Sequence, residues 1–342
     1  MSIPRPAVHI IYNPVKVKQF YKLRRLVTLR AREIGASEPV WWETTPENPG
    51  TEQAAKAAAQ GASLVVVVGG DGTVRAVAAG LAHTEVPLGI LPLGTGNLLA
   101  RNLNIPTDNL LDAVDLAFFG QQRRFDISWL RVSKVGEPSS LPPEGGLLPT
   151  WHKENLLKRG IQPAHPQEYA FMAIAGQGWD AQLMADTSTT LKQHMGWGAY
   201  VVAGAQALRA PQIRTNLRLD FKTRLSVQGR SVLFANCSTL IAGLLLVPQA
   251  KLDDGLLDVT VLSAKKGLIG WLNLFTKIAA QGAGIRQETL PGTTGELEFL
   301  QAKRAHSSVS MPQPVQVDGD AIGSAKVIDV RVDKQALVIR HG

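Results

Sequence analysis

Leu64-Val65-Val66-Val67-Val68-Gly69-Gly70-Asp71-Gly72-Thr73-Val74 is the stretch of this chain that decides its fold. Its first five residues are apolar and mostly β-branched, which predicts a strand buried on both faces. The run 74–81 after the glycines has a helical pattern. Three glycines in four positions let the backbone approach a ligand closely, and the helix N-terminus behind them offers free N–H groups to an anion. The stretch therefore predicts a phosphate-binding turn between a strand and a helix.

This glycine turn differs from the two most common phosphate-binding loops. It lacks the Lys-Ser/Thr pair of the P-loop and the spacing of G-x-G-x-x-G. An ordinary turn with Asp71 or Thr73 as the helix N-cap is the alternative. A second glycine loop, Leu91-Pro92-Leu93-Gly94-Thr95-Gly96-Asn97, follows the apolar run 88–91 and precedes a helical pattern at 98–103. Because both loops follow nearby strands, the sequence favours one crevice lined by both.

The composition is that of a folded globular protein, and its length favours two domains. The chain has 342 residues, of which 45% are hydrophobic and 19% are charged, which excludes a disordered chain. Lys and Arg number 36 and Asp and Glu 28, so the net charge is +8 and polyanionic partners are favoured. Cys237 is the single cysteine, which excludes an internal disulfide and a cysteine zinc site.

No apolar signal core or membrane-spanning run is visible in the sequence. We therefore expect a cytoplasmic protein that associates with a membrane only peripherally. Trp179, Trp197 and Trp271, each with lysines nearby, are candidates for the membrane contact, and burial in the second domain is the alternative. Basic residues are dispersed and no helix-turn-helix pattern appears, so nucleic acid is not an expected partner.

Strands and helices alternate in the first third of the chain. The pattern predicts strands at 7–12, 38–42, 64–68 and 88–91 and helices at 16–34, 51–60, 74–81, 98–103 and 108–119. This order predicts an α/β fold with a mostly parallel, doubly wound sheet. Ligands on such sheets bind outside the carboxyl ends of the strands, where Asn13, Thr45, the 70–73 turn and Thr95 fall.

After Arg123 the pattern changes to strands with period-two alternation, which predicts a mainly antiparallel second domain. The expected strands are 124–132, 169–175, 214–221, 232–237, 257–262 and 327–332, with helices at 183–208 and 266–280. The segment 133–166, rich in Pro, Gly and Ser, is expected to be a mobile surface insertion.

Carboxylates are concentrated in three further glycine turns, at 176–180, 251–258 and 315–320. Each is also consistent with a plain turn, since Asp-Gly is a strong hairpin signal. Hard cations bind oxygen ligands in flexible turns, and phosphoryl transfer needs a base beside the acceptor hydroxyl and Mg²⁺ on the phosphates. These turns are therefore the candidates for metal ligands and a base.

Five motifs in this order resemble the diacylglycerol kinase catalytic-domain family, the bacterial soluble lipid kinases related to sphingosine and ceramide kinases. They are Asn13-Pro14, Gly69-Gly70-Asp71-Gly72-Thr73, the second glycine loop at 91–97, the segment 248–258, and Asp318-Gly319-Asp320. Together they span almost the whole chain.

The resemblance implies a nucleotide-binding α/β domain of the NAD kinase and diacylglycerol kinase type, followed by a β-sandwich domain. The first would occupy 1–124 and a C-terminal return at about 335–342, and the lipid-substrate domain 125–334 with the insertion 133–166. The implied reaction transfers the γ-phosphoryl group of ATP, with Mg²⁺, to a lipid hydroxyl, foremost diacylglycerol to give phosphatidic acid. A sphingoid, ceramide-type or other lipid is the alternative acceptor, and a homodimer is left open.

The resemblance also implies site residues. ATP would be bound by Asn13, Thr45, Gly69, Gly70, Asp71, Gly72, Thr73, Thr95 and Asn97. The implied catalytic residues are Asp320, which falls where the family places its base, and Asp71, which would link the glycine turn to the metal site. A structural Mg²⁺ would be bound by the Asp254 carboxylate and the backbone carbonyls of Lys251 and Leu256.

The chain departs from the family's pattern at three places. Val15-Lys16-Val17 follows Asn13-Pro14 where the family has x-Ser-Gly, and Leu98 stands where an Asp usually follows the loop asparagine. The base is commonly Glu, and Asp320 is shorter by one C–C bond of about 1.5 Å. A shift that large would cost on the order of 10²-fold in rate unless the cleft closes further.

Two other functions stay open. NAD kinases share the Gly-Gly-Asp-Gly turn, but an Asn-Glu dipeptide in their adenosine-binding context is absent downstream. A lipid- or nucleotide-sensing protein without catalytic activity is the alternative suggested by Leu98 and Asp320. Product assays with NAD, and ATP binding without turnover, would separate these from a lipid kinase.

Overall fold

A computed structural model describes residues 5–135, 149–163, 168–178, 212–238, 247, 249–262 and 299–342. The three tryptophans considered for membrane contact and the helices expected at 183–208 and 266–280 lie outside these ranges. Within them, no helix is both long enough and apolar enough to cross a bilayer.

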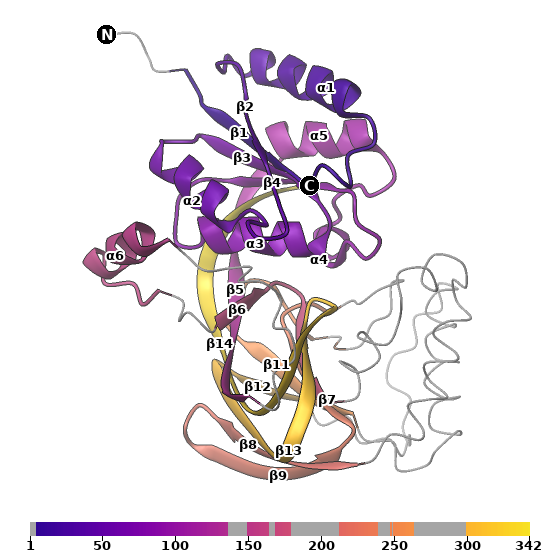
Figure 1. The fold of residues 1–342 in the computed structure, drawn as a ribbon, viewed down its shortest axis with the longest axis vertical. Helices are drawn as coiled ribbons and strands as arrows, with labels where there is room; N and C mark the ends of the chain where they lie inside the picture. Colours follow the sequence, from indigo (N-terminus) through magenta and orange to yellow (C-terminus); the bar gives the residue numbers. More distant parts are fainter. Residues whose placement is uncertain are drawn as a thin grey trace.

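Four parallel strands form the sheet of the N-terminal part in the order β4, β3, β1, β2. They are β1 (Val8–Tyr12), β2 (Val40–Glu43), β3 (Leu64–Gly69) and β4 (Leu88–Pro92). Helices α1 (Phe20–Glu33) and α5 (Leu110–Phe119) cover one face, and α2 (Thr51–Ala59), α3 (Asp71–Leu81) and α4 (Leu98–Asn102) cover the other. Figure 1 shows these layers in the upper half of the molecule.

The apolar run of β3 explains why helices pack on both faces of this sheet. Val65 and Val67 belong to the core beneath α2 and α3, whereas Val66 and Val68 belong to the core beneath α1 and α5. All four side chains are fully buried. Alternate residues of a strand point to opposite faces, so a strand without polar positions needs a cover on each. The predicted doubly wound α/β fold is confirmed.

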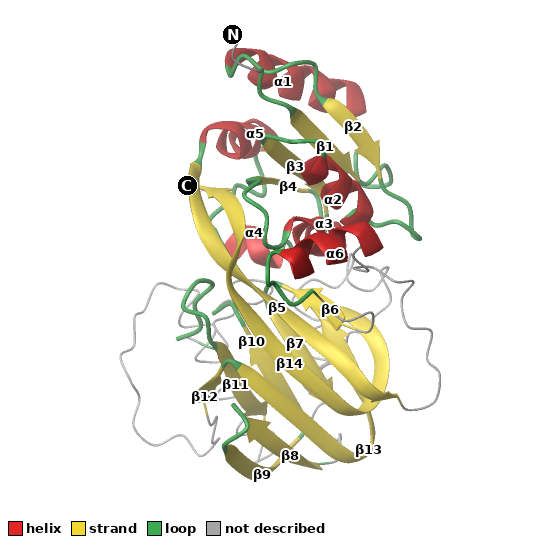
Figure 2. Ribbon diagram, turned by 90° about the vertical axis from the view of Figure 1, so that its left-hand side faces the viewer, coloured by secondary structure: helices red, strands yellow, loops and turns green. Residues whose placement is uncertain are grey.

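The remaining strands pair with one another in antiparallel fashion and form most of the lower half of the molecule (Figure 2). They are β5 (Gln121–Val135), β6 (Glu168–Phe171), β7 (Ile174–Gly178), β8 (Ile213–Leu219), β9 (Thr223–Gly229), β10 (Ser231–Ala235), β11 (Leu257–Leu262), β12 (Phe299–Ala302), β13 (Arg304–Val317) and β14 (Asp320–His341). A separate core of aliphatic side chains and Phe171 and Phe234 holds them together.

Strand β14 joins the two halves. It pairs with β13 and β5 in the antiparallel part, and its Ile339 then pairs in parallel with Leu88 of β4. The C-terminal residues thus lie in the first sheet, and Figure 1 shows β14 rising from the lower half to the C-terminus. This shared strand fixes the glycine turns of the first half relative to the turn at the start of β14.

The described part of the expected insertion 133–166 contains the end of β5 and helix α6 (Thr150–Lys158), whose His152 and Leu156 side chains are buried. One expectation about local structure was wrong. The single strand expected at 169–175 is two strands, β6 and β7. The chain breaks between them because the N–H groups of Met172 and Ala173 donate to the Asp318 carboxylate.

Candidate functional site

A pocket of about 540 Å³ gathers residues from five separate segments of the chain, at 13–15, 43–49, 72–76, 169 and 320–322. Asn13 follows β1, Thr45 follows β2, Gly72 and Thr73 lie in the first turn of α3, and Asp320 begins β14. All five are residues that the sequence predicts for the nucleotide site or the base. They meet because β1, β2 and β3 are parallel and end at the same edge of the sheet.

Hydrogen bonds within the loops set the direction of the chain after β1 and β2. The N–H of Asn13 donates to the carbonyl of Val68 (2.9 Å), and its Oδ1 accepts the N–H of Val15 (3.0 Å). Thr45 Oγ1 accepts the N–H of Asn48 (3.1 Å). Such side-chain-to-backbone bonds stabilise turns. Asn13 and Thr45 therefore shape the wall of the pocket as well as lining it.

The two glycine loops lie against each other. A Cβ on Gly94 would lie 2.7 Å from the Cα of Gly70, and one on Gly69 would lie 2.8 Å from the Cβ of Thr73, so neither position has room for a side chain. Gly70 is the N-cap of α3 and no side chain caps the helix. The alternative of Asp71 or Thr73 as N-cap is therefore wrong. The two loops touch as expected, but only the first contributes residues to the pocket lining, so one crevice lined by both loops is not observed.

Asp71 ties the second glycine loop to the first. Its Oδ2 accepts the N–H of Asn97 (2.8 Å) and its Oδ1 accepts the N–H of Leu98 (2.6 Å). Burial raises the pKa of Asp71 to about 6; the hydrogen bond from Leu98 opposes this, and the charges of Asp318 and Asp320 add to it. The position taken by Leu98 thus supplies a backbone donor to this carboxylate.

Asp320 faces the glycine turn across the pocket. Its Oδ2 forms an ion pair with Nη2 of Arg75 (2.8 Å), and a Cβ on Gly72 would lie only 3.3 Å from the same oxygen. The Asp320 side chain is half-exposed, whereas that of Arg75 is mostly buried. The residue that the resemblance implies as the base is therefore beside the turn that the sequence predicts to bind phosphate.

Asp318 has a structural role that the sequence analysis did not assign. It is buried, and its carboxylate accepts the N–H groups of Met172 (2.9 Å), Ala173 (2.8 Å) and Ile174 (3.0 Å). Its backbone φ is +47°, and that of Gly319 is +88°. The Asp-Gly pair was the available signal, because this tight turn needs left-handed backbone at both positions. Asp318 thus anchors the turn that presents Asp320.

Asp126 is a second anchor that the sequence analysis missed. The fully buried carboxylate accepts the N–H groups of Gly255 (2.6 Å) and Gln335 (2.7 Å), and the Asp126 N–H donates to the carbonyl of Leu252 (2.7 Å). Leu252 packs against the cluster that contains Leu98. Asp126 therefore holds the 251–256 loop between β14 and the start of α4. No local signal at residue 126 predicts partners so far along the chain.

The other predicted site residues lie outside the pocket lining. Gly69, Gly70 and Asp71 immediately precede Gly72 in the chain. In the second loop Asn97 is buried and Thr95 is exposed. Lys251, Asp254 and Leu256 do not line the pocket either. The Asp71 carboxylate accepts the N–H groups of Asn97 and Leu98. Within the described ranges it makes no hydrogen bond to the 251–256 loop, so a direct link of Asp71 to the metal loop is not observed.

The residues implied as metal ligands offer only oxygen atoms, from the Asp254 carboxylate and the Lys251 and Leu256 carbonyls. Burial raises the pKa of Asp126, and the charges of Asp254 and Asp253 add to the rise, so a cation would relieve this concentration of carboxylates. In the part of the chain that the structure describes, no three acidic, His or Cys side chains are grouped to hold a metal ion, and carbonyls would have to complete the site. This donor set fits a hard cation such as Mg²⁺.

Two family models match the two halves of the chain. The model described as diacylglycerol kinase catalytic domain matches residues 7–130, and the one described as YegS C-terminal NAD kinase beta sandwich-like domain matches residues 173–340. The chain therefore carries a diacylglycerol kinase catalytic domain. The expected β-sandwich in its second half is likewise confirmed.

Two relatives cover nearly the whole chain. It is 28% identical over 316 residues to a diacylglycerol kinase of Bacillus subtilis (strain 168), covering 91% of this chain and 88% of the relative. It is 27% identical over 321 residues to a diacylglycerol kinase of Staphylococcus carnosus (strain TM300), covering 92% and 89%. The chain is therefore a kinase, an enzyme that transfers a phosphoryl group.

A solved structure shares the fold of this kinase. The crystal structure of a diacylglycerol kinase from Bacillus anthracis str. Sterne superposes with a TM-score of 0.66 at 16% identity, covering 100% of this chain and 98% of that one. At this identity the likeness concerns the arrangement of the elements alone.

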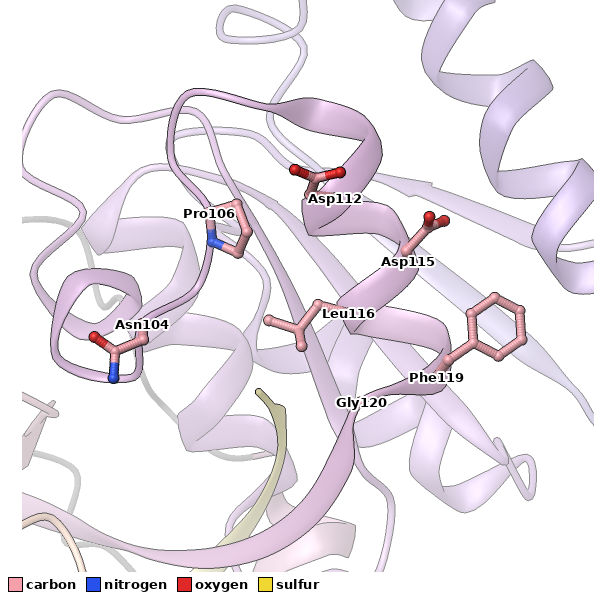
Figure 3. Close-up of a pocket in the computed structure, with 7 residues that line it drawn as sticks. All are labelled: Asn104, Pro106, Asp112, Asp115, Leu116, Phe119 and Gly120. Atoms are coloured by element: carbon pink, nitrogen blue, oxygen red, sulfur yellow. The ribbon is translucent and has the colours of Figure 1, made fainter.

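A second cavity of about 440 Å³ lies against α5 of the kinase (Figure 3). It is lined by Asn104, Pro106, Asp112, Asp115, Leu116, Phe119 and Gly120, none of which is a predicted site residue. Asp115 is occupied by an ion pair with Arg30 (2.5 Å). This cavity is therefore not the candidate active site.

The raised pKa of Asp71 makes the stability of the kinase depend on pH. Because the pKa is about 6 in the folded chain and 3.8 in the reference state, ionisation of Asp71 lowers the free energy of unfolding as the pH rises from roughly 4 to 6. Asp71→Asn cannot ionise, so we expect its free energy of unfolding to rise by roughly 2 kcal/mol relative to that of the unmodified kinase between pH 4.5 and pH 7.5. Urea unfolding at both pH values measures this, and a difference independent of pH would contradict it.

Proposed function

We propose that this kinase phosphorylates a lipid hydroxyl with ATP and Mg²⁺, with diacylglycerol as the acceptor and phosphatidic acid as the product. The observation that carries the proposal is the meeting of Gly72, Thr73 and Asp320 in one pocket. A phosphate-binding turn and a carboxylate from opposite halves of the chain are the two groups that phosphoryl transfer to an alcohol requires. The match to the diacylglycerol kinase catalytic domain supports the choice of acceptor.

The nucleotide in this proposal lies along the carboxyl edge of the first sheet. Its binding residues are Asn13, Thr45, Gly69, Gly70, Asp71, Gly72, Thr73, Thr95 and Asn97. The N-terminus of α3 contributes backbone N–H groups and the positive end of its dipole. The absence of side chains at Gly70 and Gly94 lets phosphates approach that backbone.

Asp320 is the base in the proposed reaction. Its carboxylate accepts the proton of the lipid hydroxyl while that oxygen forms a bond to the γ-phosphorus, and the bond from the γ-phosphorus to the bridging oxygen of ADP breaks. Asp320 can reach such a hydroxyl because its side chain is half-exposed at the pocket.

The metal in this proposal is Mg²⁺ held by the Asp254 carboxylate and the carbonyls of Lys251 and Leu256. When bound, such an ion would offset the negative charge that Asp253, Asp254 and Asp126 concentrate at this loop. The chain's own contribution is the anchoring of the loop: Asp126 accepts the Gly255 N–H and so fixes the backbone that carries those carbonyls.

The proposal assigns residues 1–124 and about 335–342 to the ATP-binding domain and 125–334 to the lipid-substrate domain. A lipid substrate requires contact with a membrane surface, so the proposal includes a cytoplasmic kinase that associates peripherally with a membrane. Whether the kinase forms a homodimer is a question for a measurement of its mass in solution.

The test is a panel of acceptors in mixed micelles. Pure kinase is incubated with γ-labelled ATP, Mg²⁺ and diacylglycerol, sphingosine or ceramide, and with NAD in a separate reaction. We expect labelled phosphatidic acid from diacylglycerol, and omission of Mg²⁺ to abolish it. Labelled product only from sphingosine or ceramide would show that this lipid, and not diacylglycerol, is the acceptor. Absence of a labelled lipid from every acceptor would contradict the proposal.

A further inference from the structure

Arg75 is the side chain that connects the glycine turn with the turn before β14. It lies in the first half of α3, three residues after Gly72, and the residues that it reaches are more than 240 positions further along the chain. Its guanidinium donates through Nη1 to the carbonyl of Val317 (3.0 Å) and through Nη2 to Oδ2 of Asp320 (2.8 Å). The two contacts lie at the two ends of the turn 317–320.

The planar guanidinium suits this geometry. Two N–H groups that point in fixed directions hold a carbonyl and a carboxylate at once, which a lysine ammonium with its single flexible nitrogen does not reproduce. The Arg75 side chain is only 15% exposed, so solvent competes weakly for these bonds, whereas that of Asp320 is 52% exposed. Arg75 is thus the fixed partner in the pair and Asp320 the one that is held.

We propose that Arg75 is a positioning residue for Asp320, which it holds beside Gly72 so that the carboxylate faces the acceptor hydroxyl. This inference rests on the proposed function and goes beyond it by naming the group that aims the base. Asp320 is shorter than Glu, so its reach depends more strongly on where the backbone of the turn is held. Because misplacement of a reacting group by about 1 Å can cost on the order of 10²-fold in rate, loss of Arg75 affects the chemical step.

The opposite assignment is that Arg75 binds the phosphates of the nucleotide. Arginine is a common phosphate ligand, and Arg75 lines the same pocket as Thr73. The two assignments differ in what they do to kinetics. A positioning residue lowers kcat and leaves the KM for ATP nearly unchanged, whereas a phosphate ligand raises that KM.

The kinetic test uses Arg75→Gln and Arg75→Lys with the acceptor that the kinase uses in mixed micelles. The control is Arg214→Gln, an exposed arginine on β8 that does not line the pocket. We expect kcat to fall about 30- to 100-fold in Arg75→Gln and about 5- to 10-fold in Arg75→Lys, with the KM for ATP within about threefold and the control unchanged. A KM for ATP raised about tenfold or more with kcat preserved would overturn the proposal.

A double-mutant cycle separates positioning from general destabilisation. When Asp320→Asn has removed the carboxylate, adding Arg75→Gln should lower the residual kcat by less than about threefold, because the group to be positioned is gone. If the fold-decreases in kcat of the two single variants multiply in the double variant, Arg75 does not act through Asp320, and the proposal is overturned.

Hydrogen–deuterium exchange provides a readout that does not need kinase activity. We expect amide exchange in the peptide that contains Val317 and Asp320 to be about tenfold faster in Arg75→Gln than in the unmodified kinase, with Arg214→Gln unchanged. Unchanged exchange in Arg75→Gln would overturn the proposal. If the unmodified kinase phosphorylates no acceptor, the proposed function fails while exchange still decides whether Arg75 holds the turn.

Discussion

Replacement of Asp320 by Asn is expected to lower kcat at least about 100-fold while ATP affinity stays within about threefold. Asn has nearly the same shape but cannot accept a proton from the lipid hydroxyl, and removal of a general base typically costs 10²- to 10⁴-fold. ATP affinity is preserved because Asp320 lies opposite the glycine turn and is not part of it. Phosphatidic acid formation gives kcat, and calorimetric titration gives the ATP affinity.

The matched control for this change is Asp108→Asn, an exposed aspartate before α5 that does not line the pocket. It should leave both quantities unchanged. Undiminished turnover in Asp320→Asn would remove Asp320 from the role of base, and a large loss of ATP affinity would show that the residue acts on the nucleotide instead.

Replacement of Asp318 by Ala is expected to lower the free energy of unfolding by about 3 to 5 kcal/mol. The change leaves the N–H groups of Met172, Ala173 and Ile174 without their acceptor, and each buried donor left unpaired costs about 1 to 3 kcal/mol. Asp318→Asn should be milder, by about 1 to 3 kcal/mol, because one oxygen can still accept the two bonds that Oδ1 accepts at present.

Urea unfolding measures both Asp318 variants against the unmodified kinase, with Asp108→Asn again as the control. The graded order Ala, then Asn, then unmodified is the expected result. Stability of Asp318→Ala within about 0.5 kcal/mol of the unmodified chain would contradict the anchoring role.

The N-terminal half could be predicted from the sequence because its signals are local. The apolar run at 64–68 specifies a strand buried on both faces, and the glycines at 69, 70 and 72 mark the turn that follows. Each βα step repeats a strand pattern followed by a helical pattern, so the order of elements implies a parallel sheet. Asn13, Thr45 and the glycine turn could be placed together for the same reason.

Strand β14 was predicted only in part. The pattern gave 327–332, whereas the strand spans Asp320–His341. The polar run Asp333, Lys334 and Gln335 interrupts the apolar alternation where β14 passes from one half to the other, and the pairing register with β5 shifts there. Gln335 has a φ of +51°, which bends the strand at this irregularity. A strand that crosses between two cores does not keep one alternation throughout.

The buried polar residues of the site could not be predicted because their partners are remote. Asp126 accepts from Gly255 and Gln335, and Arg75 donates to Val317 and Asp320, at separations of 129 to 245 residues. Nothing in the neighbouring sequence marks these positions. The motifs indicate which turns are candidates for the chemistry, and the folded chain was needed to find the residues that hold those turns.

The most direct test of the account is transfer of label from γ-labelled ATP to diacylglycerol by three forms of the kinase: unmodified, Asp320→Asn and Gly72→Val. A Cβ added at Gly72 would lie 3.3 Å from Oδ2 of Asp320 and 3.8 Å from Nη2 of Arg75. The valine side chain would therefore fill the space between the glycine turn and the base. The account predicts labelled phosphatidic acid from the unmodified kinase and at least about 100-fold less from each variant. No labelled lipid from the unmodified kinase, or undiminished label from both variants, would contradict it.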